Sequence, residues 1–226
     1  MCGICGIFES GRESPLDVST LKGMADLLRH RGPDDDGYYL NTEIGLGHRR
    51  LSIIDLKGGH QPLSNEDGSI WVAFNGEIYN FKEIRAELEA SGCRFRSQTD
   101  TEVILAAYDR WGIAAVQRMV GMFAFAIWDE PKRRLWIVRD RLGKKPLLYA
   151  RLTDGSLAFA SETKALLRLP NLPRELDLAQ LDAYLALQYV PRSGFRSVEK
   201  VSPGSFVVAE GTSVRSERYW SPRAAE

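Results

Sequence analysis

The sequence has few cysteines, no net charge and no long apolar run. Its 226 residues include only Cys2, Cys5 and Cys93, and an odd, sparse set does not make a disulfide framework. Lysine plus arginine number 30, and aspartate plus glutamate also number 30, so no overall field favours nucleic acid or an anionic membrane. No apolar run approaches the roughly 20 residues that cross a bilayer, and no signal-type segment opens the chain. These absences predict a cytoplasmic protein that binds neither nucleic acid nor membrane.

The composition and the apolar periodicity predict a globular α+β protein. Apolar residues make up 44% and charged residues 27%, close to the averages for a folded domain. Strands are predicted at 2–8, 37–40, 44–54 and 70–75, and hairpins at 122–139, 147–160 and 205–219. Helices are predicted at 16–30, after Asn80, from Asp100 to Gly112, at 161–168 and at 177–188. Strands joined by short turns, with helices in separate groups, favour antiparallel sheets over an alternating βαβ order.

Cys2 is the residue that most strongly suggests chemistry. It directly follows Met1, and it becomes the N-terminal residue if Met1 is removed. A free α-amino group has a pKa of about 7.7–8.0, far below that of a lysine side chain. It can therefore act as the general base for the thiol of its own residue. The competing interpretation is an ordinary small residue at the start of a strand.

Other motifs point away from metals, nucleotides and nucleic acid. Cys2 and Cys5 form a C-x-x-C pair, but only Cys93 remains and no H-x₃₋₅-H pattern occurs, so neither a zinc site nor a redox site is predicted. The stretch 45–50 lacks the third glycine of a dinucleotide fingerprint, and the chain contains no P-loop. The basic run at 130–145 alternates with apolar residues and is interpreted as a solvated strand face and turn.

Three further positions are ambiguous when each is taken alone. Asn75-Gly76 follows an apolar run. The pair is typical of a turn, and it could equally supply two N–H donors to an oxyanion. Arg50 enters an apolar stretch, where an arginine usually has an anionic partner. Asp100 stands at a helix start, where it caps the helix or holds an ammonium group.

Seven blocks of sequence, taken in order, change this assessment. They are MCGI at 1–4, RHRGPD at 29–34, HRRLSIID at 48–55, QPL at 61–63, FNGEIYN at 74–80, TDTEVIL at 99–105 and RDRLGKKPL at 139–147. Together they resemble the N-terminal glutaminase domain of glutamine-hydrolysing asparagine synthetases. That domain is a class II glutamine amidotransferase of the N-terminal-nucleophile hydrolase type. The resemblance covers nearly the whole chain.

The resemblance implies a fold and a set of roles. The fold would be a four-layer αββα sandwich of two antiparallel sheets. Cys2 would attack the side-chain amide of L-glutamine, and Asn75 with Gly76 would form the oxyanion hole. Arg50 would pair with the substrate carboxylate and Asp100 with its ammonium group. The remaining pocket residues would be Leu51, Ser52, Ile53 and Glu77.

The resemblance also implies partners and domain limits. The amidotransferase domain would span 2–210, and 211–226 would hold its final strand and the start of a linker to a C-terminal or separate synthetase domain. ATP and Mg²⁺ are expected only in that domain, and the glutaminase reaction would need no cofactor or metal. The resemblance further suggests a homodimer. Two alternatives remain: ammonia delivered to another acceptor, or a glutaminase-like module without activity.

Overall fold

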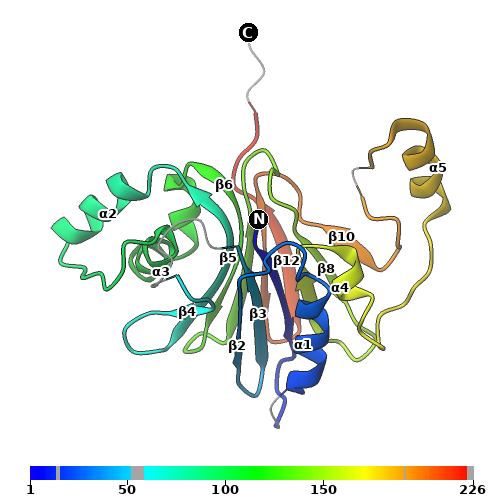
Figure 1. Ribbon diagram of the computed structural model, residues 1–226, viewed down its shortest axis with the longest axis horizontal. Coiled ribbons are helices and arrows are strands. Elements are labelled where there is room, and N and C mark those ends of the chain that lie inside the picture. The colour runs from blue at the N-terminus through cyan, green and yellow to red at the C-terminus, as the bar shows by residue number, and fades with distance from the viewer. Residues whose placement is uncertain (14–15, 52–58, 191, 223–226) are drawn as a thin grey trace.

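Two six-stranded antiparallel sheets form the centre of the protein (Figure 1). The computed structural model describes residues 1–13, 16–51, 59–190 and 192–222. The first sheet has the order β10 (Val198–Lys200), β8 (Leu148–Arg151), β9 (Leu157–Ala160), β1 (Gly3–Phe8), β3 (Ile44–Arg50) and β2 (Asp35–Leu40). The second has the order β12 (Ser213–Arg218), β11 (Ser205–Glu210), β7 (Arg134–Arg139), β6 (Gly121–Asp129), β5 (Ile70–Ile78) and β4 (Leu63–Ser64).

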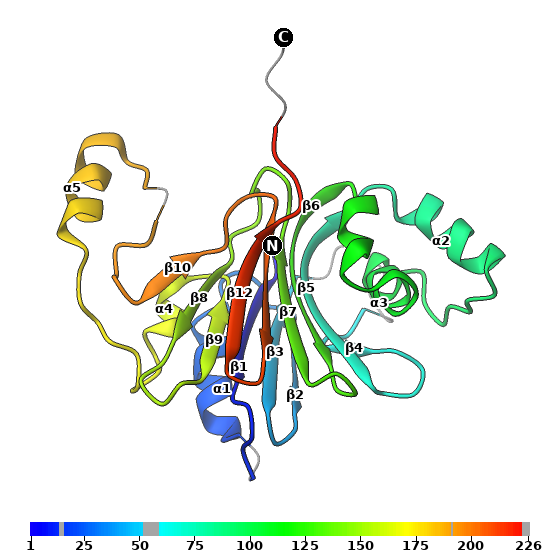
Figure 2. The same cartoon turned by 180° about the vertical axis from the view of Figure 1, so that it is seen from behind.

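Helices cover the outer face of each sheet, which confirms the predicted αββα layers (Figures 1 and 2). The first sheet is covered by α1 (Val18–Asp26) and α4 (Thr163–Leu166). The second is covered by α2 (Phe81–Ala90), α3 (Asp100–Trp111) and the 3₁₀ helix η1 (Gly112–Arg118). Helix α5 (Leu178–Leu187) has no buried residue and stands apart from the other helices in both views.

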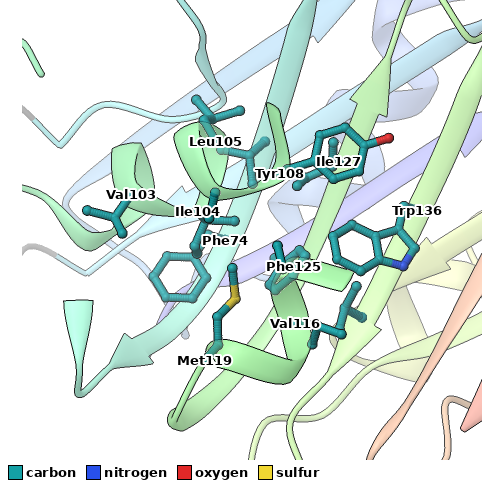
Figure 3. Packing of buried hydrophobic residues seen from close by; sticks show 14 of the residues in the cluster. Phe74, Val103, Ile104, Leu105, Tyr108, Val116, Met119, Phe125, Ile127 and Trp136 are labelled. Atoms are coloured by element: carbon teal, nitrogen blue, oxygen red, sulfur yellow. The ribbon is translucent and has the colours of Figure 1, made fainter. Parts of the chain in front are cut away.

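Strand alternation explains why the sheets pack on both faces. In β6, Phe123, Phe125 and Ile127 belong to the cluster under α3, whereas Ala124 and Ala126 belong to the cluster between the two sheets. Successive side chains of a strand point to opposite faces, so one strand supplies two hydrophobic layers. Figure 3 shows the α3 side of this arrangement, where Ile104 and Tyr108 pack over the aromatic residues of the sheet.

Several boundaries differ from the predicted ones. Helix α1 ends at Asp26, not at residue 30, because the chain continues in hydrogen-bonded turns from Leu28 to Arg31. Strand β3 ends at Arg50, and residues 52–54 of the predicted strand lie outside the described part. Strand β5 continues to Ile78 rather than ending at residue 75, because its whole length pairs with β6. Among the described residues, no helix combines the length and apolar character needed to cross a membrane.

Candidate active site

A cavity of about 130 Å³ opens where β1, β3 and β5 meet at one end of the sandwich. The N-terminus lies at this central position in both views of the ribbon (Figures 1 and 2). The small volume suits a ligand of amino-acid size better than a drug-sized ligand, whose pockets are typically about 300–1,000 Å³. Its lining consists of Met1, Cys2, Arg50, Leu51, Gly59, Gln61, Phe74, Asn75, Gly76, Glu77, Thr99, Asp100, Thr101, Met122 and Lys145.

Cys2 directly precedes β1 of the first sheet, and both its thiol and its carbonyl oxygen are hydrogen-bonded. Its Sγ lies 3.5 Å from the backbone N–H of Leu51, which donates to it, and 3.8 Å from the Leu51 carbonyl oxygen. Arg31 donates from Nε to the Cys2 carbonyl oxygen at 2.9 Å. Further along β1, the Ile4 N–H donates to Ser161 Oγ at 3.0 Å. These bonds fix the backbone around the thiol.

Arg31 is itself anchored away from the cavity. Its Nη1 donates to Glu162 Oε1 at 2.9 Å, and the side chain is nearly buried. Charge-assisted bonds of this kind are stronger than neutral ones. The guanidinium therefore orients the terminal strand.

Asn75 and Gly76 lie side by side in β5, facing the cavity. The Asn75 side chain is only 1% exposed, and among the described residues its Nδ2 has no hydrogen-bond partner. A buried amide N–H₂ without a partner costs roughly 1–3 kcal/mol, so a bound ligand that accepts from it would recover that cost. At Gly76, a Cβ atom would collide with the carbonyl oxygen of Met122 on the paired strand. Only glycine allows β5 and β6 to approach so closely here.

Asp100 is the first residue of α3, but it does not cap the helix. The cap is Thr99, whose side chain accepts from the Glu102 N–H at 3.3 Å. The Asp100 carboxylate instead accepts from the Ile78 N–H at 3.0 Å, at the end of β5. Burial raises the pKa of Asp100 above its ordinary value, and the nearby Glu77 charge adds to this. Such a carboxylate is suited to a cationic ligand.

Arg50 supplies a positive charge to the same cavity. It is the last residue of β3 and is buried. Its guanidinium lies against Gly59, where any Cβ would collide with it. A buried carboxylate and a buried guanidinium in one small cavity can together hold an amino-acid zwitterion.

The cavity collects most of the residues expected from the sequence and adds others. Leu51 and Glu77 line it as expected, whereas Ser52 and Ile53 lie outside the described residues. Gln61 was not assigned a role, yet its Oε1 accepts from the Phe74 N–H at 2.7 Å. Its Nε2 donates to Thr101 Oγ1 at 3.3 Å. Gln61 thereby provides an acceptor for the Phe74 N–H of β5, which the two-residue strand β4 is too short to pair.

Lys145 corrects the prediction for the basic run at 130–145. That run was interpreted as a solvated strand face and turn, but Lys145 is buried and lines the cavity. Residues 135–138 are likewise buried, because β7 lies in the middle of the second sheet. The block RDRLGKKPL contained the signal, but alternation alone could not show which of its basic residues points inward.

No histidine lines the cavity in the described part of the chain. His48 is buried, lies 3.0 Å from the Phe74 carbonyl oxygen through Nε2, and has a pKa lowered to about 4 by burial. His30 and His60 are exposed and pair with Glu162 and Asp35. The thiol of Cys2 therefore has no imidazole base among these residues.

Comparisons with known proteins relate the chain to glutamine amidotransferases. The sequence model of the glutamine amidotransferase domain matches residues 1–220. The chain is 44% identical over 209 residues to asparagine synthetase [glutamine-hydrolyzing] 1 of Bacillus subtilis, covering 91% of this chain and 33% of that protein. It is 38% identical over 247 residues to a putative asparagine synthetase [glutamine-hydrolyzing] of Mycobacterium tuberculosis, covering all of this chain and 38% of the relative. The chain thus spans about a third of the length of these relatives.

Solved structures share the fold at low sequence identity. The allosteric regulatory enzyme of purine biosynthesis superposes with a TM-score of 0.72 at 23% identity, over 97% of this chain and 49% of that one. The glutamine phosphoribosylpyrophosphate amidotransferase of B. subtilis gives a TM-score of 0.68 at 21% identity, over 97% and 49%. These structures share the fold of two packed antiparallel sheets, and the family match over residues 1–220 shows that the chain belongs to the class II glutamine amidotransferase domain family.

Proposed function

We propose that this chain hydrolyses L-glutamine to glutamate and ammonia through a γ-glutamyl thioester on Cys2. The observation that carries the proposal is the shared cavity. It holds a thiol, a buried amide donor without a described partner, a carboxylate and a guanidinium. Nucleophile, oxyanion donor and two groups for a zwitterion are the parts that amide hydrolysis of an amino acid requires. The relatives named as glutamine-hydrolysing support the choice of substrate.

The reaction begins after removal of Met1, whose side chain is 55% exposed. The α-amine of Cys2 takes the thiol proton, and Sγ forms a bond to the amide carbon of glutamine. The oxyanion accepts from Asn75 Nδ2 and the Gly76 N–H. The carbon–nitrogen bond then breaks as the ammonium group of Cys2 returns its proton to the departing ammonia.

Hydrolysis of the thioester completes the cycle. The α-amine, again neutral, removes a proton from water, whose oxygen attacks the thioester carbon within the same oxyanion hole. The carbon–sulfur bond breaks, glutamate leaves, and the proton passes to Sγ. Throughout, Arg50 pairs with the substrate α-carboxylate and Asp100 with its α-ammonium, while Leu51 and Glu77 complete the lining.

A direct test measures ammonia release from L-glutamine by the chain after removal of Met1, with the mature mass showing that Cys2 is N-terminal. Turnover dependent on Cys2, with one glutamate formed per ammonia, is the expected result. A folded chain with a free Cys2 terminus that releases no ammonia would reject the proposal and favour a module without activity.

Replacing Asn75 with alanine should lower kcat by roughly 10²–10³-fold, the usual loss for one oxyanion donor. KM for glutamine should stay within a few-fold, because the donor acts on charge that develops after binding. Steady-state kinetics of ammonia release provide the measurement. Asn171→Ala is the matched control, because Asn171 is exposed and bonds Asp154 outside the cavity. A steep rise in KM with unchanged kcat would make Asn75 a ground-state contact.

Glutamine binding should weaken as the pH falls through the raised pKa of Asp100. The carboxylate must be ionised to pair with the α-ammonium, and burial makes it take up a proton at higher pH than an ordinary aspartate. Loss of this bond should weaken binding roughly 10- to 100-fold, from about 1.5–3 kcal/mol per charge-assisted bond at 1.4 kcal/mol per tenfold. Calorimetry on Cys2→Ala protein, which does not consume glutamine, measures Kd against pH.

The matched comparison is the double variant that also carries Asp100→Asn. Its affinity should be low at every pH and should lose the dependence assigned to Asp100. Affinity that changes with pH in the same way in both proteins would remove Asp100 as the ammonium partner.

We further propose that the ammonia is used by an ATP-dependent synthetase part that amidates aspartate. The names of the relatives support this acceptor, as does the fact that two thirds of their length lies outside the matched region. ATP and Mg²⁺ would act there, and the thioester chemistry derived above uses neither.

A further inference from the structure

Lys145 is a buried cation in the cavity that the proposed reaction does not yet use. Its side chain lies in the segment between β7 and β8, is 6% exposed and lines the same cavity as Cys2. In the part of the chain that the structure describes, its ammonium group has no hydrogen-bond or ion-pair partner. Because the lysine lines the cavity, an anionic atom in the cavity would stabilise its charge.

The backbone that carries Lys145 is held rigidly. The Asp140 carboxylate accepts from the backbone N–H groups of Leu142, Lys144 and Lys145 at 3.0–3.1 Å. The same carboxylate accepts from the Phe123 N–H at 3.2 Å. Phe123 pairs with Gly76 across β5 and β6, so this anchor links the Lys145 segment to the strand that carries the oxyanion donors.

Arg139 holds the segment from its other side. Its guanidinium donates to the carbonyl oxygens of Lys145 at 2.8 Å, Gly143 at 2.7 Å and Val201 at 2.8 Å. The side chains of Arg139 and Asp140 thus both hold the segment that ends at Lys145 in place. Their arrangement fixes the backbone from which the lysine enters the cavity.

The charges around the thiol come from several elements. The groups that line or flank this end of the cavity are Arg31, Arg50, Glu77, Asp100, Asp140 and Lys145. Arg31 is bonded to the Cys2 carbonyl oxygen and to Glu162, and it orients the strand. Burial, and next the Arg31 charge, lower the pKa of Lys145, whereas negative charge on Cys2, Asp140 and Glu77 opposes this. The ammonium group is therefore stabilised when the thiol is ionised.

We propose that Lys145 is the counterion of the Cys2 thiolate. The catalytic role of Lys145 rests on the proposed function. The ion pair itself requires only that Cys2 and Lys145 line the same cavity. When the thiol proton moves to the α-amine, the Lys145 ammonium group adds to the new α-ammonium in balancing the charge left on Sγ. Lys145 thus keeps more of the nucleophile ionised at neutral pH without making or breaking a bond.

Alkylation of Cys2 by iodoacetamide across a pH series tests the ion pair without any turnover, because only the thiolate reacts. In Lys145→Met protein, the pH of half-maximal alkylation should rise by about one unit, the lower end of the effect of a nearby opposite charge. Lys145→Arg should restore most of the wild-type profile. Peptide mass spectrometry assigns the modification to Cys2 rather than to Cys93.

Lys144→Met is the matched control, because the neighbouring lysine is exposed and does not line the cavity. It should leave the alkylation profile unchanged. Lys145→Gln provides a second neutral variant if the methionine variant does not fold, and the same upward shift is expected. A profile that is the same in wild type and in a folded neutral variant overturns the inference.

The ion pair and the proposed function fail separately. A chain that lacks glutaminase activity but shows the alkylation shift rejects the function and keeps the ion pair. An active enzyme with no shift rejects only the ion pair. In an active enzyme, the acid limb of kcat/KM should also move to higher pH in Lys145→Met, a change that a purely structural role would not produce.

Discussion

Replacing Cys2 with alanine is expected to reduce ammonia release from glutamine to the background of the assay. Cys2 provides the only thiol among the side chains that line the cavity in the described residues, and no hydroxyl there is paired with a base. The fold should persist, because within the described ranges the Cys2 side chain bonds only the Leu51 backbone. Losing these weak contacts should cost about 1 kcal/mol or less. Thermal unfolding should therefore change little while turnover disappears.

Cys93→Ala is the matched control for this substitution. Cys93 is also a partly exposed free cysteine, but it packs beside the cluster under α3 and does not line the cavity. Its variant should retain full activity. Cys2→Ala protein that still releases ammonia at a rate within tenfold of wild type would reject the thioester route.

Strand periodicity and turn residues were sufficient to predict the core of the fold. The hairpin predicted at 122–139 became β6 and β7, and Asp129 pairs with Arg134 beside its turn. Alternating side chains in such strands determine which face packs on helices and which on the other sheet. Boundaries were weaker, as at Asp26, because a hydrogen-bonded turn after a helix carries the same apolar spacing as another helical turn.

The site was predicted less completely, for a different physical reason. Asn75, Gly76 and Asp100 were ambiguous when taken alone, and they could be proposed because the family resemblance assigned each of them a role. Gln61 and Lys145 could not, because their importance depends on contacts with strands distant in the sequence. The start of α3 also shows how two adjacent residues differ in role: Thr99 caps the helix, which leaves the Asp100 carboxylate to accept from the Ile78 N–H and line the cavity.

A permanent N-terminal extension should lower glutaminase activity by at least about 10²–10⁴-fold, the usual value of general-base assistance. The proposed base is the α-amine of Cys2, and any residue before it converts that amine to an amide, whose nitrogen does not accept a proton near neutral pH. Met1 already lines the cavity, so a longer extension would also obstruct the substrate. The thiol itself would remain in place.

Removing the extension with a protease that leaves Cys2 at the terminus should restore activity, with the mature mass confirming the cut. An extended Cys2→Ala protein, cut in the same way, controls for the protease and should stay inactive. A cysteine hydrolase with a histidine base would tolerate the extension, but His48 is bonded to Phe74 with a pKa lowered to about 4, and His30 and His60 pair elsewhere. Equal rates before and after cleavage would therefore remove the α-amine from the mechanism. The geometry of the cavity and the family of the chain would be unaffected by that result.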